Sequence, residues 1–147
     1  PLMQVRPLFG PAPRTFDPQE DLMGNIAYVR PSTFVPLSQA TVHEGLVYVS
    51  GQVGFRPGTT ELVSPDVAEQ CRQVFRHIDD ILGEAGTSRR HIVRCGVFLR
   101  DVARDFAAMN ACYTEWLGDH RPARTTVGAE FALPGILVEV DCIAALL

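Results

Sequence analysis

Two segments near the C-terminal end of the sequence contain the residues best suited to chemistry. Arg124 and Thr126 alternate in the first segment, and Glu139 and Asp141 alternate in the second. If both segments are strands, residues two apart share a face, so we expect all four side chains on one face of a sheet, opposite an apolar core. A guanidinium fork suits a small carboxylate ligand, and a nearby glutamate can move protons. The alternative is a solvated sheet face with surface ion pairs.

The composition narrows the class of protein. The chain has 147 residues, 46% of them hydrophobic and 20% charged, which fits one globular domain with a real core. A net charge of −4 does not favour a nucleic-acid surface. All 13 basic residues are arginine, so no lysine can hold pyridoxal phosphate as a Schiff base. With neither an apolar run of roughly 20 residues nor a signal-peptide core, we expect a cytoplasmic protein without a membrane segment.

The cysteines and histidines show no ligand pattern. The cysteines are Cys71, Cys95, Cys112 and Cys142, and the histidines are His43, His77, His91 and His120. No two cysteines have C-x-x-C spacing, and the histidines form no tight cluster. We therefore predict buried, reduced core thiols in a reducing compartment and no dedicated metal site.

The order of elements predicts an α+β domain. Residues 1–25 contain five prolines and read as an irregular arm, and residues 26–147 read as the folded domain. We predict strands over 26–30, 41–43, 46–50, 91–99, 124–131 and 136–145. One helix starts at Ser64-Pro65-Asp66 and stops near Gly86, and a second runs from the cap Asp101 to Gly118. The expected fold is a single mixed sheet of six strands.

Two amphipathic helices can cover only one face of such a sheet. The second helix has the core stripe Val102, Phe106, Met109, Tyr113 and Trp116. The uncovered face would carry Ile92, Phe98, Leu137 and Ile143 beside Arg124, Glu139 and Asp141. Monomers avoid exposing a mixed apolar patch of this kind, so we predict a homo-oligomer with the charged residues in a cleft between subunits.

Several motifs in order along the chain resemble one known family. They are Pro36-Leu37-Ser38-Gln39-Ala40, the run from Gly45 to Gln52, Gln70, the run from Val97 to Asp101, Asp105-Phe106, Asn110, Tyr113, Pro122-Ala123-Arg124 and Val138-Glu139-Val140. Together they resemble the YjgF/RidA family over roughly residues 27–146. The ordered set is far more specific than any single motif, since Ser-Gly-Gln alone would mean little.

The resemblance implies a chorismate-mutase-like fold assembled as a homotrimer with three clefts between subunits. It also implies hydrolysis of reactive enamines and imines, such as 2-aminoacrylate, to 2-keto acids and ammonia without a metal or organic cofactor. Arg124 resembles the residue that grips the substrate carboxylate, Glu139 resembles the acid that activates water, and Gly51 offers a backbone N–H. The other residues expected to line the cleft are Ser50, Leu37, Phe98 and Thr126.

Three positions depart from the family pattern. Leu37 stands where many deaminating members have tyrosine, Thr126 where many have cysteine, and His77 where asparagine is common. A leucine at the cleft mouth favours a substrate that is larger or less polar than 2-aminoacrylate.

Three other functions remain open. One is a binding or regulatory protein that recognises carboxylates without converting them, although such a binder gains nothing from Glu139. Another is a ribonuclease, which the negative net charge disfavours. A chorismate-type rearrangement rests on fold analogy alone.

Overall fold

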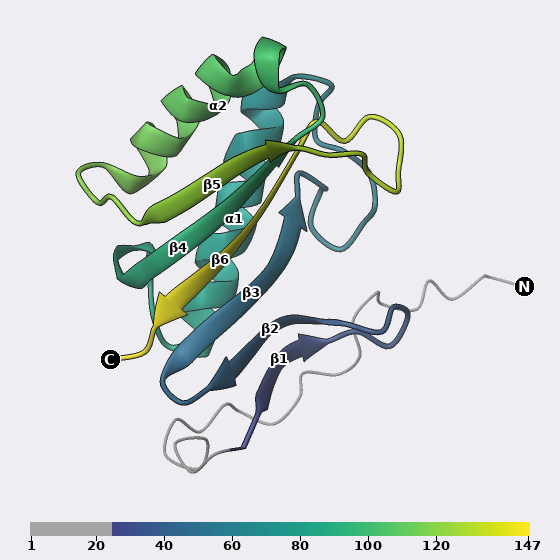
Figure 1. Cartoon of the computed structure of the whole chain (residues 1–147). Coiled ribbons are helices and arrows are strands. Elements are labelled where there is room, and N and C mark those ends of the chain that lie inside the picture. Colours follow the sequence, from purple (N-terminus) through teal and green to yellow (C-terminus); the bar gives the residue numbers. More distant parts are fainter. Residues whose placement is uncertain (1–24) are drawn as a thin grey trace, which may run out of the picture.

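Six strands form one mixed sheet with two helices packed on one of its faces (Figure 1). The structure is a computed structural model that describes residues 25–147, so the predicted arm over 1–25 lies outside the described residues apart from Asn25. The strands are β1 (Ala27–Pro31), β2 (Ser38–His43), β3 (Leu46–Val53), β4 (Ile92–Leu99), β5 (Ala123–Gly128) and β6 (Val138–Ala145). The helices are α1 (Val67–Ala85), the short 3-10 helix η2 (Arg89–His91) and α2 (Val102–Leu117).

The strand order is β1-β2-β3-β6-β4-β5, which confirms the predicted six-stranded mixed sheet. Only the β4–β5 pair is parallel, and α2 provides the crossover that a parallel pair requires. Strand β4 lies between β5 and β6, so these two strands are consecutive in the chain but not neighbours in the sheet. Within residues 25–147, neither helix combines the length and the apolar character needed to cross a membrane.

The helix ends follow from capping residues. Asp66 caps α1 by accepting a hydrogen bond from the Glu69 N–H, at 3.1 Å. The predicted start at Ser64 was too early, because the Ser64 hydroxyl instead accepts from the Asp66 N–H at 3.0 Å and orders the turn before the helix. The predicted stop at Gly86 is confirmed, and this glycine has a left-handed φ of 89°. Asp101 caps α2 as predicted.

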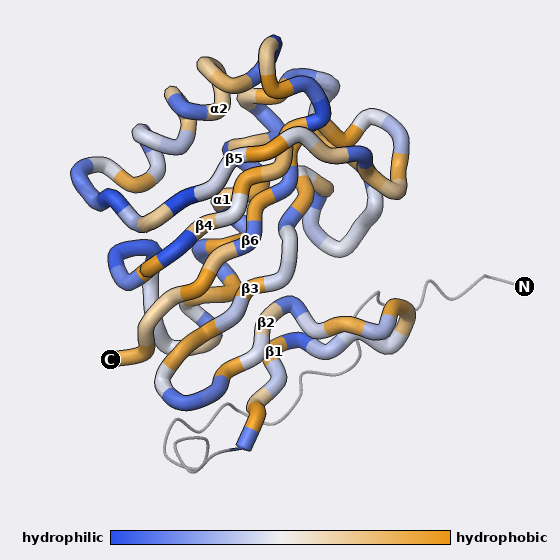
Figure 2. The backbone as a smooth tube through the Cα atoms, in the orientation of Figure 1, coloured by the Kyte–Doolittle hydropathy of each residue, from blue (hydrophilic) through white to orange (hydrophobic). Residues whose placement is uncertain are grey.

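The core lies between the helices and the sheet, and Figure 2 shows apolar residues recurring along β3, β4 and β6. All four cysteines are buried and none forms a disulfide, as predicted. Phe75 of α1 stacks on Trp116 of α2 with ring centroids 4.3 Å apart, which joins the two helices. The predicted core position of Phe106 is wrong, because its side chain is 40% exposed and lies beside a charged residue of β5.

Gln70 of α1 connects the helix to the loops at one end of the sheet. Its side chain is fully buried and donates to the carbonyls of Ser64 (2.9 Å) and Gly135 (3.0 Å). Its carbonyl oxygen accepts from the Leu137 N–H at 3.0 Å, just before β6. Gly54 packs on the Gln70 backbone so closely that a Cβ would lie 2.8 Å from the Gln70 carbonyl oxygen. The Gln70 side chain therefore fixes where β6 begins, and the Gln70 backbone packs against the end of β3.

We expect Gln70→Leu to lower the free energy of unfolding by roughly 2–5 kcal/mol, because up to three buried backbone groups lose a partner at about 1–3 kcal/mol each. Urea denaturation measures the change. Gln73→Leu is the matched control, since Gln73 is also buried but contacts only the side chains of His77 and Arg76. Its effect should stay below about 1 kcal/mol. Equal losses for the two variants would contradict the role given to Gln70.

Candidate functional site

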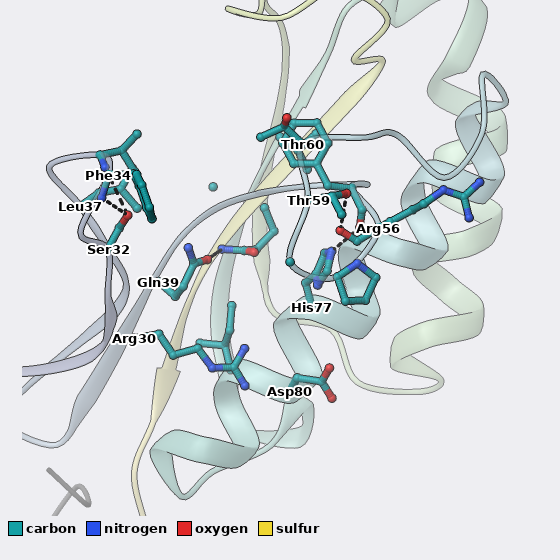
Figure 3. Close-up of a pocket in the computed structure, with 18 of the residues that line it drawn as sticks. Arg30, Ser32, Phe34, Leu37, Gln39, Arg56, Thr59, Thr60, His77 and Asp80 are labelled. Atoms are coloured by element: carbon teal, nitrogen blue, oxygen red, sulfur yellow. Dashed lines mark hydrogen bonds between the residues drawn. The ribbon is translucent and has the colours of Figure 1, made fainter. Parts of the chain in front are cut away.

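A pocket of about 600 Å³ opens where β2 and β3 separate (Figure 3). The pairing of these strands ends at Ala40 and Val49. Beyond it, Ser50 and Gly51 form a β-bulge, because these two residues lie opposite the single residue Asp141 of β6. The Ser50 hydroxyl donates to the Ser38 carbonyl at 2.6 Å and holds β2 beside the bulge. The bulge thus sets the mouth of the pocket.

Glu139 lies against Gly51, one of the residues that line this pocket. It pairs with Val53, which lines the pocket, and a Cβ on Gly51 would overlap its carboxylate. A side chain at position 51 would therefore force the acid to move from this place. Glu139 is half-buried, and burial, with the neighbouring Asp141 as the second cause, raises the pKa of its carboxyl group. Asp141 itself accepts from the Gly96 N–H at 3.0 Å. The site holds an acid that keeps its proton more readily than an exposed glutamate.

A second group of polar residues surrounds Arg124. The guanidinium carbon lies 4.7 Å from the Tyr113 ring centroid and 5.9 Å from that of Phe106, so both rings of α2 face the cation. Among residues 25–147 no carboxylate lies within ion-pair distance of Arg124. The Thr126 hydroxyl is buried and meets hydrogen-bond geometry with no described residue, and the buried Tyr113 hydroxyl has only the Cys95 thiol beside it. A cation and a buried hydroxyl without a partner suit an anionic ligand that accepts hydrogen bonds.

Arg124 and Glu139 lie on opposite faces of the sheet, so their predicted placement on one face is wrong. Arg124 pairs with Cys95 and Thr126 pairs with Val97, and both partners face the helices. The alternation in β5 was predicted correctly, but the core was expected on the wrong face: Val127, on the face opposite Arg124, is 42% exposed. Strand β4 also separates β5 from β6 by roughly 10 Å. One chain cannot bring the two side chains onto the same small ligand.

A second correction concerns Ile92, which was predicted on the uncovered face. It is 1% exposed, because an irregularity in the β4–β6 pairing between Ile92 and Arg94 turns it toward the core. Phe98 does lie on the uncovered face, directly opposite Glu139. The predicted residues therefore form two groups. The first, called the pocket group, comprises Leu37 and Gly51, which line the pocket, together with Ser50 of the bulge and the paired residues Phe98 and Glu139, which do not line it. The second, the Arg124 group, is Arg124 and Thr126 with the added Tyr113.

Sequence reasoning missed several residues of both groups. Phe106 and Tyr113 are seven residues apart on one face of α2, a spacing that could have indicated their shared contact with β5. The pocket residues Phe34 and Phe55 lie in loops without any periodic pattern. Among the described residues, no three His, Cys, Asp or Glu side chains lie close enough together to hold a metal ion.

Comparisons with known proteins agree on one family. A family model described as Endoribonuclease L-PSP matches residues 28–146. A RutC family protein of Pyrococcus abyssi is 38% identical over 114 residues, which cover 78% of this chain and 89% of the relative. The human protein named 2-iminobutanoate/2-iminopropanoate deaminase is 32% identical over 114 residues, which cover 78% of this chain and 82% of the relative. The crystal structure of RidA from the Antarctic bacterium Psychrobacter sp. matches with a TM-score of 0.71 at 35% identity, covering 79% of this chain and 93% of that one.

Glu139→Gln should make the protein more stable at neutral pH. The raised pKa means that the folded state holds the Glu139 proton more tightly than the unfolded chain, whose ordinary value is 4.5. Stability is therefore lost as the pH rises from there through the folded-state pKa. Glutamine does not ionise and avoids this loss, so the gain should be present at about pH 7 and absent at about pH 4.

Urea denaturation at both pH values measures the difference. Glu130→Gln, a change of an exposed glutamate, is the control and should show no gain that depends on pH. A gain of the same size at both pH values would show that the effect does not come from ionisation of Glu139.

Proposed function

Because the chain belongs to the Endoribonuclease L-PSP family, which includes the YjgF and RidA proteins, we propose that it hydrolyses 2-imino acids and their enamine tautomers to 2-keto acids and ammonia. The observation that carries the proposal is that each of the two groups contains one charged or ionisable side chain suited to act on a ligand. Arg124 has no carboxylate partner among the described residues, and Glu139 is an acid with a raised pKa. A relative named as an imine deaminase, 32% identical to this chain, supports the same reaction.

Arg124 binds the substrate carboxylate in this proposal. Its guanidinium can donate two parallel hydrogen bonds to the two carboxylate oxygens. The rings of Tyr113 and Phe106 hold the planar group in place and exclude water from one of its faces. The hydroxyl of Thr126, which lacks a partner, lies two residues along the same strand face and can donate to the same ligand.

Glu139 transfers protons to and from water. The imine carbon becomes electrophilic when its nitrogen is protonated, and a water molecule that loses a proton to Glu139 attacks it. The C–O bond forms as the C=N double bond becomes a single bond, which gives a tetrahedral aminoalcohol. Glu139 then returns the proton to the nitrogen. As the C–N bond breaks, the hydroxyl oxygen forms the C=O bond and gives its proton to the ionised Glu139, so that a keto acid and ammonia leave, and the proton passes from Glu139 to the ammonia through water. A raised pKa brings the acid closer to neutral pH, where one group can both accept and donate protons.

The two groups meet between copies of the chain in this proposal, in a homotrimer with three clefts. Arg124 of one copy then faces Glu139 of the next, which one chain alone does not allow. Support comes from the uncovered sheet face, which carries apolar side chains in two places. Tyr28, Tyr48 and Ile143 follow one another across β1, β3 and β6, with Thr41 of β2 between the two tyrosines. Phe98 and Val127 are neighbours farther along β4 and β5. Tyr28 is 59% and Tyr48 is 40% exposed, a patch that association would bury.

The proposal has two further parts, which concern the folded unit and the location of the protein. The folded unit comprises residues 26–147, with residues 1–25 as an arm attached to it. We also propose a reducing, cytoplasmic location, which the four buried cysteines without disulfides support.

Changing Arg124 and Glu139 should have different effects. Arg124→Lys keeps the charge but loses the bidentate fork, so binding of a carboxylate should weaken about 10- to 150-fold, which corresponds to roughly 1.5–3 kcal/mol. Glu139→Gln keeps the shape and removes the ionisable group, so turnover should collapse while the keto-acid product still binds. Ammonia release and calorimetric product binding measure the two effects. Wild-type turnover by both variants would place the reaction elsewhere.

A mixing experiment tests whether the site lies between copies. Arg124→Ala and Glu139→Gln should each be inactive alone. When the two variants are coexpressed and assemble at random, about one cleft in four receives an intact Arg124 from one copy and an intact Glu139 from the next, as a closed head-to-tail ring requires. Activity should return to about a quarter of the wild-type value.

Two controls complete this test. Sedimentation should give the mass of three chains for each variant and for the mixture. No recovery of activity in mixed trimers would mean that both residues act within one chain or that one of them does not act at all.

Ribonuclease activity is the second candidate, because the family description names an endoribonuclease. The net charge of −4 argues against a surface that attracts RNA. Cleavage of a labelled RNA that persists in Arg124→Ala and Glu139→Gln would assign that activity to another surface. Binding of 2-keto acids without any ammonia release would instead favour a regulatory carboxylate-binding protein.

A further inference from the structure

We infer that the pocket beside Gly51 holds the side chain of the substrate, and that the preferred substrates are 2-imino acids with a large apolar or aromatic side chain. The inference rests on the proposed function, because it takes the reacting carbon to lie near Glu139. It adds a specificity subsite built by residues 31–37, the loop over 53–60 and one face of α1.

The two walls of the pocket present apolar side chains. One wall is the turn between β1 and β2, where Phe34 is 53%, Val35 is 48% and Leu37 is 47% exposed. The facing wall includes Phe55 and Pro57 of the loop after β3. Figure 3 shows Phe34 and Leu37 on one side of the opening and the loop with Arg56, Thr59 and Thr60 on the other. An apolar group between the walls would be removed from water on both sides.

The polar groups deeper in the pocket already have partners. The Gln52 amide donates to the Gln39 side-chain oxygen at 2.9 Å. His77 hydrogen-bonds the Phe55 carbonyl at 2.7 Å through its Nε2 atom. Arg30 forms an ion pair with Glu84 of α1. A polar substrate side chain would therefore lose its hydration without gaining free partners, whereas an apolar one leaves no protein group unsatisfied.

The charged residues Arg56 and Asp80 also line the pocket, but both are exposed. Their charged ends can stay hydrated while an apolar group fills the space between the walls. The test below distinguishes this inference from the alternative that Arg56 and Asp80 bind a charged substrate side chain.

The size of the pocket and the residue at its mouth both favour a large apolar substrate side chain. A volume of about 600 Å³ falls in the range of small-molecule sites and far exceeds the methyl or methylene group of a three-carbon imine. Leu37, which lines the pocket together with Gly51, offers a surface without a hydroxyl group. A tyrosine there would narrow the entrance and add a polar group.

The test compares imines that differ only in their side chain. An amino acid oxidase generates them in the assay from 2-aminobutyrate, leucine and phenylalanine, and ammonia release is measured. The wild type should favour the leucine-derived imine over the short one by roughly 10- to 20-fold in kcat/KM, since each buried methylene is worth about fourfold. Calorimetry with 2-oxobutanoate, 4-methyl-2-oxopentanoate, phenylpyruvate and 2-oxoglutarate measures the same preference without turnover.

Variants locate the preference in the pocket. Phe34→Ala should raise KM about tenfold for the phenylalanine-derived imine and less than about twofold for the short one, with kcat little changed. Leu37→Tyr should shift the preference toward the short imine. Leu133→Ala is the control, because Leu133 is exposed to a similar extent, 42%, in a loop that does not line the pocket. Thermal melting and sedimentation confirm that each variant folds and assembles.

The outcomes separate this inference from the proposed function. Tight, Phe34-dependent binding of phenylpyruvate without turnover of any imine would keep the subsite and overturn the deaminase. Turnover with a preference for the short imine, or tighter binding of 2-oxoglutarate than of 4-methyl-2-oxopentanoate, would keep the deaminase and overturn the subsite. An equal loss on all imines in Phe34→Ala, together with a smaller assembly mass, would show that the turn contacts another copy and would also overturn the subsite.

Discussion

The β-bulge at Ser50 and Gly51 is the local constraint on which the pocket group depends. It lets β3 remain paired with β6 while it leaves β2, and the gap between the strands becomes the pocket. Because Gly51 has no Cβ, the Glu139 carboxylate can lie against the backbone of β3. Bulges commonly stand beside functional sites because they redirect a strand without breaking the sheet. Here one extra residue creates both the cavity and the space for the acid beside Gly51.

The Arg124 group is arranged in a different way. β5 is an edge strand, so its helix-facing residues are less completely covered than those of β4. Aromatic rings of α2, rather than a carboxylate, hold the cation in place. A carboxylate partner within the chain would have satisfied Arg124 and left less attraction for a ligand. The rings orient the guanidinium and leave its hydrogen-bond donors available, which suits the proposed binding of an anionic ligand.

Much of the fold could be predicted from the sequence because caps and alternation are local signals. Helix α1 ends at Gly86 and helix α2 begins after Asp101, as predicted. The inward face of β6 was also predicted correctly. The face of β5 could not be predicted, because alternation defines two faces without saying which one meets the helices. That choice depends on the register with β4, in which Arg124 lies opposite Cys95. The walls of the pocket were missed because loops such as 31–37 contain no repeating pattern.

The separation of Arg124 from Glu139 also bears on how the acid would work. Burial and Asp141 raise the Glu139 pKa within one chain, whereas a guanidinium brought close by a neighbouring copy would offset part of that rise. In the proposed cleft, a substrate carboxylate bound to Arg124 neutralises that guanidinium and removes most of its effect on the acid. The pKa of Glu139 would then rise when the substrate binds, so that the acid is closest to neutral pH while the imine is present. An arginine on the same chain and face as Glu139 would pair with it directly, and this dependence on the substrate would be lost.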